Sequence, residues 1–169
     1  KAGGIGVIHR NLKIKSQSDE VKKVKRKNFL VGAAIGTSKE DLERARSLLD
    51  NGVDLIVIDT AHGHSLKVIK ILSKLKKINS KKAICVGNIA TGEAAKKLYN
   101  TGADIIKVGI GPGSICTTRM VAGIGAPQIS AIMEVKKALS KKKIKIISDG
   151  GIKFSGDIAK ALAAGADAI

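Results

Sequence analysis

Short apolar runs recur along the chain, and segments of helical periodicity separate them. The runs are rich in Val and Ile and show little polar alternation, which is typical of strands buried on both faces of a parallel sheet. The intervening segments carry apolar residues at a spacing of three or four, which predicts amphipathic helices. Strands and helices in alternation predict an α/β fold. The predicted strands lie within residues 3–8, 29–35, 53–58, 83–86, 105–108 and 144–148, and the predicted helices within 18–26, 37–49, 66–78, 93–100, 129–140 and 156–163.

One sequence unit occurs three times and sets the spacing of these elements. Asn51 to Ile58 returns as Thr101 to Val108, and in shortened form as Ala164 to Ile169. In each copy a glycine ends a helix and a strand follows within about two residues. The pattern predicts six full strands and the beginning of a seventh. Two architectures fit this pattern, an open doubly wound sheet and a (β/α)8 barrel.

The predicted strands end in clusters of polar residues and glycine. A barrel brings all its strand carboxyl ends to one mouth, whereas an open sheet brings together only those near its switch point. We therefore predict a (β/α)8 TIM barrel, of which residues 1–169 form a single, incomplete domain. The clusters are His9-Arg10-Asn11, Asp59-Thr60-Ala61-His62, Gly87-Asn88, Gly109 to Cys116 and Asp149-Gly150-Gly151.

The most unusual of these clusters is a glycine-rich loop that leads to a cysteine. Gly109, Gly111 and Gly113 alternate with other residues, and Ser114 and Cys116 follow. Such a backbone lets a ligand approach closely, its amides bind anions, and its carbonyls bind cations. The loop is not a P-loop, which needs Gly-Lys-Ser/Thr, nor a dinucleotide fingerprint, which needs a glycine where Cys116 stands. Spacing alone is equally consistent with a nucleophile beside a phosphate site and with a tight turn holding a structural cysteine.

Composition narrows the class of protein. The net charge of +17 suggests nucleic acid, but two Phe, one Tyr and no Trp provide few stacking platforms, so we expect no specific nucleic-acid binding. No apolar run is long enough to cross a bilayer, and no signal peptide is recognised, so we expect no membrane association. Cys85 and Cys116 lie in segments unlike a disulfide scaffold, which predicts a cytoplasmic protein. Cys85, inside a strand, is predicted to pack in the core.

The strand-end clusters and the loop resemble the IMP dehydrogenase family. The resemblance implies the second to seventh strands of that family's barrel and the start of the eighth. The family's first strand, its mobile flap with an arginine base and its regulatory tandem module have no counterpart here, so we expect the chain alone to be inactive. The matching segments are Gly3 to Asn11, Gly32 to Gly36, Val57 to Gly63, Gly87 to Thr91, Gly109 to Gln128 and Ser148 to Ile152.

The resemblance also implies an activity and a role for each site residue. The family oxidises inosine monophosphate (IMP) to xanthosine monophosphate with NAD and water, through a covalent cysteine intermediate, and forms homotetramers. It implies Cys116 as the nucleophile with Thr118 near the hydrolytic water, and potassium bound by the carbonyls of Gly111, Gly113 and Cys116. For the substrate it implies Ser114, Asp149, Gly150 and Gly151, and for the cofactor Asp59, Thr60, Ala61, Asn88, Gly109, Ile110 and Gly111.

Two alternatives remain at this point. One is guanosine monophosphate reductase, a related NADPH-dependent enzyme that has the same loop and cysteine. The segments Met120 to Gly123 and Gly3 to His9 resemble the dehydrogenase more closely. The other is a non-catalytic nucleotide- or nucleic-acid-binding barrel that uses its basic surface.

Overall fold

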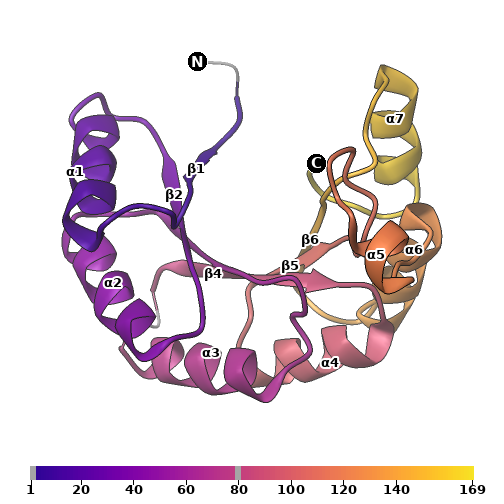
Figure 1. The fold of residues 1–169 in the computed structure, drawn as a ribbon, viewed down its shortest axis with the longest axis horizontal. Helices are drawn as coiled ribbons and strands as arrows, with labels where there is room; N and C mark the ends of the chain where they lie inside the picture. Colours follow the sequence, from indigo (N-terminus) through magenta and orange to yellow (C-terminus); the bar gives the residue numbers. More distant parts are fainter. Residues whose placement is uncertain (1–2, 79–80) are drawn as a thin grey trace.

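The computed structural model describes residues 3–78 and 81–169. The strands of this described part form one parallel sheet, and their order in space is their order in the sequence. This order has no switch point, and Figure 1 shows that the sheet curls into half a barrel. The barrel prediction is therefore confirmed over the open doubly wound sheet. The strands are β1 (Gly6–Ile8), β2 (Val31–Ile35), β3 (Leu55–Asp59), β4 (Ala83–Ile89), β5 (Ile105–Val108) and β6 (Lys145–Ser148).

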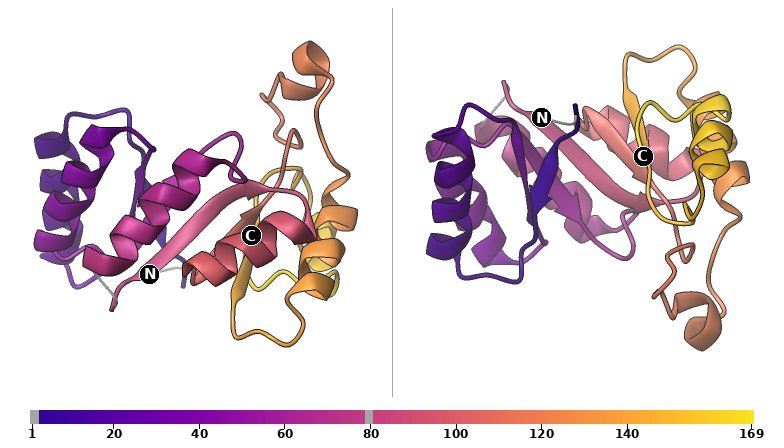
Figure 2. Two further views of the ribbon diagram at one scale, coloured as in Figure 1. Left: turned by 90° about the horizontal axis from the view of Figure 1, so that it is seen from below. Right: turned by 90° about the horizontal axis from the view of Figure 1, so that it is seen from above.

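A seventh strand begins after the last helix, as the repeat predicts. Ala168 forms a parallel bridge with Ile147 of β6. Except for the short α5, the helices lie along the outer, convex side of the sheet, where each crossover returns the chain to the next strand (Figure 1 and Figure 2). No helix in the described residues is long and apolar enough to cross a membrane. The helices are α1 (Ile14–Lys25), α2 (Lys39–Asp50), α3 (Leu66–Ile78), α4 (Gly92–Thr101), α5 (Thr118–Ala122), α6 (Gln128–Ala138) and α7 (Ser155–Ala163).

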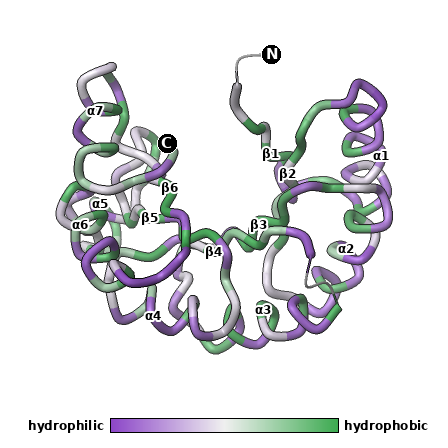
Figure 3. Tube along the Cα trace, turned by 180° about the vertical axis from the view of Figure 1, so that it is seen from behind, coloured by the Kyte–Doolittle hydropathy of each residue, from purple (hydrophilic) through white to green (hydrophobic). Residues whose placement is uncertain are grey.

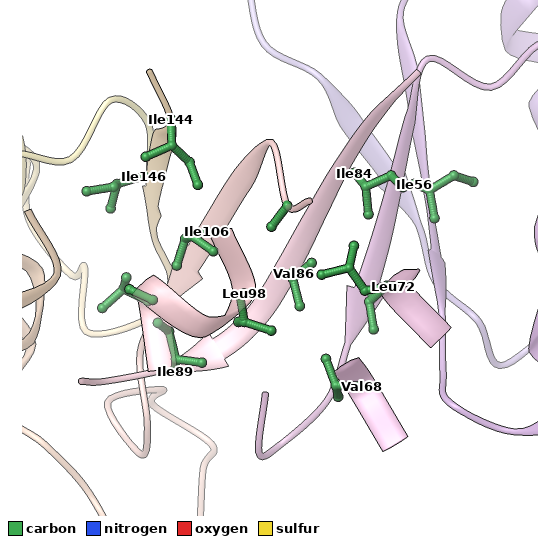
Figure 4. Close-up of a cluster of buried hydrophobic side chains, with 14 of the residues drawn as sticks. Ile56, Val68, Leu72, Ile84, Val86, Ile89, Leu98, Ile106, Ile144 and Ile146 are labelled. Carbon is green, nitrogen blue, oxygen red and sulfur yellow. The ribbon is translucent and has the colours of Figure 1, made fainter. Parts of the chain in front are cut away.

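The main core lies between the sheet and this outer layer of helices. Strand residues such as Ile56 and Ile106 are buried against helix residues such as Leu72 and Leu98 (Figure 4). Figure 3 shows the same distribution, with hydrophobic strands inside and hydrophilic residues on the outside of the helices. Each fully buried Leu or Ile contributes about 1.5–3 kcal/mol relative to an exposed one.

A second, smaller cluster faces the inside of the half barrel. It consists of Ala34, Leu55, Val57 and Cys85, with Ile147 packed against it. Cys85 is fully buried there, so its predicted role in core packing is confirmed.

The repeated glycine and aspartate have a clear structural explanation. Each glycine adopts a positive φ, between 82° and 114°, at the end of a helix. The aspartate two residues after each glycine accepts a hydrogen bond from the backbone amide of the first or second residue of the preceding strand. Each of these aspartates also forms an ion pair with a lysine. The unit therefore attaches each helix end to the strand before it. The aspartates and their lysines are Asp54 with Lys25, Asp104 with Lys76, and Asp167 with Lys145.

The first strand and the first helix differ from the prediction. The strand predicted as buried has only residues Gly6–Ile8, and Val7 remains 47% exposed because β1 pairs on one side only, with β2, within the described residues. The first helix begins at Ile14 rather than at Ser18, and Ser18 lies inside it at the contact with α2, where its hydroxyl is 2.8 Å from that of Ser47. A serine followed by acidic residues is also compatible with a helix interior when a neighbouring helix supplies the hydrogen-bond partner.

One strand extends beyond its predicted limits, and one helix lies in a segment predicted as loop. β4 continues past Val86 to Ile89, with a register shift between Gly87 and Ile89. The loop after β5 contains the short helix α5, which buries none of its residues. Figure 2 shows this helix at the end of a loop that extends away from the sheet. Because no residue of the helix is buried there, its sequence needs no apolar face that would predict it.

Candidate active site

The carboxyl ends of β3 to β6 surround a cavity of about 280 Å³. Parallel strands bring these ends to one edge, which is where barrel proteins place their ligands. Most of the lining residues are predicted site residues, and Arg10 and Lys107 are the two exceptions. The lining consists of Arg10, Asp59, Thr60, Ala61, Asn88, Lys107, Gly109, Ile110, Gly111, Cys116, Thr118 and Asp149.

Cys116 is exposed at this cavity, so the structure does not place it in a structural role in the core. Its sulfur lies 3.2 Å from the hydroxyl oxygen of Thr118. Hydrogen bonds from the side chain and backbone of Thr118 lower the pKa of the Cys116 thiol; burial opposes this shift, and the positive charge of Arg119 adds to it least. Because the thiolate is the nucleophilic form of cysteine, this environment favours covalent attack.

Cys85 has the opposite environment. Burial raises the pKa of its thiol to about 12, and the charge of Lys107 opposes the shift only in part. Cys85 therefore remains protonated at neutral pH and is unreactive. The two cysteines of this chain thus differ in both accessibility and ionisation.

Lys107 connects the polar residues of the cavity. It projects from β5, and its Nζ lies 3.0 Å from Oδ1 of Asp59 and 2.6 Å from Oδ2 of Asp149. It also donates a hydrogen bond to Oδ1 of Asn88. Burial favours the neutral amine, but the hydrogen bond and charge of Asp149, together with Asp59, outweigh it and raise the pKa of Lys107. The ammonium ion is therefore retained at any physiological pH.

Asp149 is held ionised by the same contacts. Burial acts to raise its pKa, but hydrogen bonds from Lys107 and Asn88 outweigh burial and the pKa is lowered. Asn88 Nδ2 donates both to Oδ2 of Asp149 and to the carbonyl of Gly109, each at 2.8 Å. An ionised carboxylate with an accessible oxygen is well suited to accept hydrogen bonds from the hydroxyls of a diol.

Gly109 joins β5 to the loop in a space that admits no side chain. Its φ is +154°, and an added Cβ would lie 2.0 Å from the carbonyl oxygen of Asp149. Gln128, at the start of α6, secures the same junction by donating to the carbonyl of Val108 at 2.8 Å and to the hydroxyl of Ser148 at 3.0 Å. The loop therefore leaves β5 in one direction, over the end of β6.

Four predicted site residues lie outside the lining of the cavity, namely Gly113, Ser114, Gly150 and Gly151. Ser114 is exposed on the loop. Gly150 and Gly151 pack against the loop, because an added Cβ at Gly150 would lie 3.1 Å from the Gly113 nitrogen and one at Gly151 would lie 3.2 Å from the Pro112 side chain. The end of β6 and the loop are thus in contact beside the cavity, and backbone amides of both segments are close together.

The carbonyl groups proposed for potassium fit a cation by their chemistry. The carbonyl of Gly113 accepts a hydrogen bond from the amide of Cys116 at 3.1 Å and retains a second lone pair. The carbonyls of Gly111 and Cys116 accept no hydrogen bond from any residue that the structure describes. Carbonyl oxygens without competing donors are suitable ligands for a hard cation.

Lys107 is the main residue of the cavity that the sequence analysis misses. A signal for it is present, because a lysine occurs within the otherwise apolar strand Ile105-Ile106-Lys107-Val108. A charge in a strand that is buried on both faces is retained only where opposite charges surround it. That argument points to a functional cluster inside the barrel.

The fold and this cavity define the protein as a (β/α)-barrel protein with an exposed cysteine on the loop after its fifth described strand. A family model for the IMP dehydrogenase / GMP reductase domain matches residues 1–169, and the chain belongs to this family.

Several relatives of this chain are inosine-5′-monophosphate dehydrogenases. The protein from Aquifex aeolicus is 55% identical over 139 residues, which cover 82% of this chain and 28% of the relative. The protein from Staphylococcus aureus is 57% identical over 141 residues, which cover 83% of this chain and 29% of the relative. The protein from Cryptosporidium parvum is 45% identical over 213 aligned residues, which cover all of this chain and 52% of the relative. The chain thus spans between about a quarter and a half of the length of these relatives.

Proposed function

We propose that the complete protein is an IMP dehydrogenase, which oxidises IMP to xanthosine monophosphate with NAD and water. The observation that carries the proposal is the exposed Cys116, whose pKa is lowered, at a cavity that also contains two carboxylates suited to ribose diols. The relatives that bear the dehydrogenase name support it, since the identity reaches 57%. The proposal concerns the complete protein because the chain spans only part of each relative.

Cys116 acts as the nucleophile in this reaction, because C2 of the purine must become tetrahedral before it can lose a hydride. The thiolate attacks C2 of the purine and forms a C–S bond while the electron pair of the π bond between C2 and N3 moves onto N3, which makes C2 tetrahedral. NAD supplies the acceptor for the hydride that C2 then loses, so the purine is oxidised by two electrons and remains attached to sulfur as a thioimidate. Water attacks C2, the C–S bond breaks, and a proton is released. Thr118, whose hydroxyl lies 3.2 Å from the sulfur, would hold this water.

The remaining site residues bind and orient the two ligands. Asp149 would accept the ribose hydroxyls of IMP, and amides around Ser114, Gly150 and Gly151 would bind its phosphate. Asp59, with Thr60 and Ala61, would accept the ribose of NAD, while Asn88, Gly109, Ile110 and Gly111 would contact the nicotinamide. The carbonyls of Gly111, Gly113 and Cys116 would hold potassium and fix the loop.

The setting of this reaction is also part of the proposal. We place the enzyme in the cytoplasm as a homotetramer in guanine nucleotide biosynthesis, with residues 1–169 in one catalytic barrel domain. The basic surface is a solvated lysine layer in this proposal, and it contributes to attraction of anionic nucleotides rather than to nucleic-acid recognition.

An assay of the complete protein with each nucleotide distinguishes the two activities of the family. We expect reduction of NAD with IMP and no oxidation of NADPH with guanosine monophosphate. The expectation rests on the segments Met120 to Gly123 and Gly3 to His9, which resemble the dehydrogenase. Oxidation of NADPH with guanosine monophosphate, in the absence of the NAD reaction, would assign the reductase activity instead.

Potassium should activate the complete protein. If carbonyls of Gly111 and Gly113 surround the cation, potassium binding stabilises the loop that carries Cys116. We expect kcat to rise severalfold when potassium is added and to fall when lithium replaces it at constant ionic strength. Equal activity in both salts would remove the cation role from these two glycines.

A further inference from the structure

We propose that Lys107 is a positioning residue that orients the carboxylates of Asp59 and Asp149 together, so that binding of both IMP and NAD depends on it. The inference rests on the proposed function, because it takes these carboxylates as the acceptors for the two ribose groups. Nothing in the residue pattern or in the family match assigns this role to Lys107.

The geometry places a single ammonium ion between residues of three other strands. Asp59 ends β3, Asn88 lies in β4, and Asp149 follows β6, while Lys107 itself lies in β5. The Lys107 side chain is only 15% exposed, whereas those of Asp59 and Asp149 are 47% and 45% exposed. The lysine is therefore behind the carboxylates, and the carboxylates face the cavity.

Each carboxylate keeps one oxygen for a ligand. Lys107 contacts Oδ1 of Asp59, and both Lys107 and Asn88 contact Oδ2 of Asp149. Among the described residues, none donates a hydrogen bond to Oδ2 of Asp59 or to Oδ1 of Asp149. One oxygen of each side chain thus fixes its rotamer, and the other is available to a ribose hydroxyl. Such preorganisation increases affinity because less conformational freedom is lost on binding.

Removal of the lysine would also leave two like charges facing one cavity. The carboxylates would repel each other and rotate towards solvent, which their exposure allows. Water solvates them in that arrangement, so the loss falls mainly on ligand binding rather than on folding. Lys107 touches no reacting atom, and the rate of the bound complex should change little.

The test uses Lys107→Met in the complete protein, with the Kd for IMP measured by calorimetry and the KM for NAD measured at saturating IMP. We expect both constants to rise about tenfold and kcat to change by less than about threefold, which is the pattern of lost uniform binding. Lys107→Arg keeps the charge and should recover part of both affinities, and Lys107→Gln replaces the methionine variant if that variant does not fold. Lys145→Met, on the exposed Lys145 that pairs with Asp167, is the matched control and should leave both constants unchanged.

The outcomes separate this inference from the proposed function. If the wild-type protein turns over IMP and the uncharged variants keep both constants, Lys107 has no positioning role and the proposed function stands. A loss of kcat alone, with both constants unchanged, also overturns the inference, because it assigns Lys107 to the chemical step. A wild-type protein that binds neither IMP nor NAD overturns the proposed function itself.

Discussion

The Cys116→Ser variant of the complete protein should produce no burst of NADH when it is mixed with IMP and NAD. Hydride cannot leave C2 of a planar purine until a nucleophile makes that carbon tetrahedral, and a serine hydroxyl is a much weaker nucleophile than a thiolate at neutral pH. We expect kcat to fall at least about a thousandfold, because a missing nucleophile removes the covalent route altogether. The Kd for IMP should stay within about threefold of the wild-type value, since Asp149 and the loop amides are unchanged. Stopped-flow absorbance and calorimetry measure the two quantities.

Cys85→Ser is the matched control for this variant. Cys85 is fully buried and its thiol pKa is raised to about 12, so it is protonated and has no part in the attack. The hydroxyl introduced into an apolar cluster should cost about 1–3 kcal/mol of stability while the burst amplitude remains. Mass spectrometry after quenching should find the nucleotide on the peptide that contains Cys116. A normal burst in Cys116→Ser would reject the covalent mechanism.

The parallel half barrel could be predicted from the sequence because each of its elements is encoded locally. Leu55–Asp59 and Ile105–Val108 are apolar strands preceded by a glycine that ends a helix, and neither feature depends on distant residues. The Ser38 cap of α2 was similarly predictable, since its hydroxyl and Asp41 form a capping box within four residues. Once the strand order is sequential, the polar clusters at the carboxyl ends must meet at one edge.

The features that could not be predicted depend on contacts between distant segments. Gln17 lies in the first turn of α1, which the sequence pattern does not predict. Its side-chain Nε2 donates to the backbone carbonyl of Ala34 at 2.9 Å, and its side-chain Oε1 accepts a hydrogen bond from Arg44. The exposure of Val7 depends on whether a second strand pairs with β1, which is not a property of the strand itself. Lys107 could not be assigned from the sequence for the same reason. Its contacts with Asp59, Asn88 and Asp149 form only when the folded chain brings these distant residues together.

The resemblance added residue roles that neither the periodicity nor the spacing supplies. From the pattern, Cys116 is equally compatible with a structural thiol, and the structure shows its sulfur exposed next to Thr118, which favours the proposed nucleophile. The structure brings Asp59, Asn88 and Asp149 together around one lysine, although they are far apart in the sequence. It leaves Ser114 on the exposed part of the loop, outside the lining of the cavity, so its phosphate role stays a prediction.

Gly109→Ala should be the most damaging change of a glycine in this loop. The added Cβ would lie 2.0 Å from the carbonyl oxygen of Asp149, and both backbone segments are fixed. The amide of Gly109 donates to Ile89, and its carbonyl accepts from Asn88. Overpacking against backbone that cannot move, together with the positive φ, should lower the free energy of unfolding by about 3 kcal/mol or more.

Gly123→Ala provides the matched control, because Gly123 also has a positive φ, of 65°, but an added Cβ there has no atom within 4 Å. It should lose only the backbone contribution of about 1 kcal/mol. Denaturant unfolding of the complete protein measures both changes, and the difference between them isolates the contact with Asp149. Since that contact holds the end of β6 against the loop, Gly109→Ala should also raise the Kd for IMP, whereas Gly123→Ala should not. Equal destabilisation by the two variants would show that the junction between β5 and β6 moves freely, and that Gly109 does not determine where Asp149 lies.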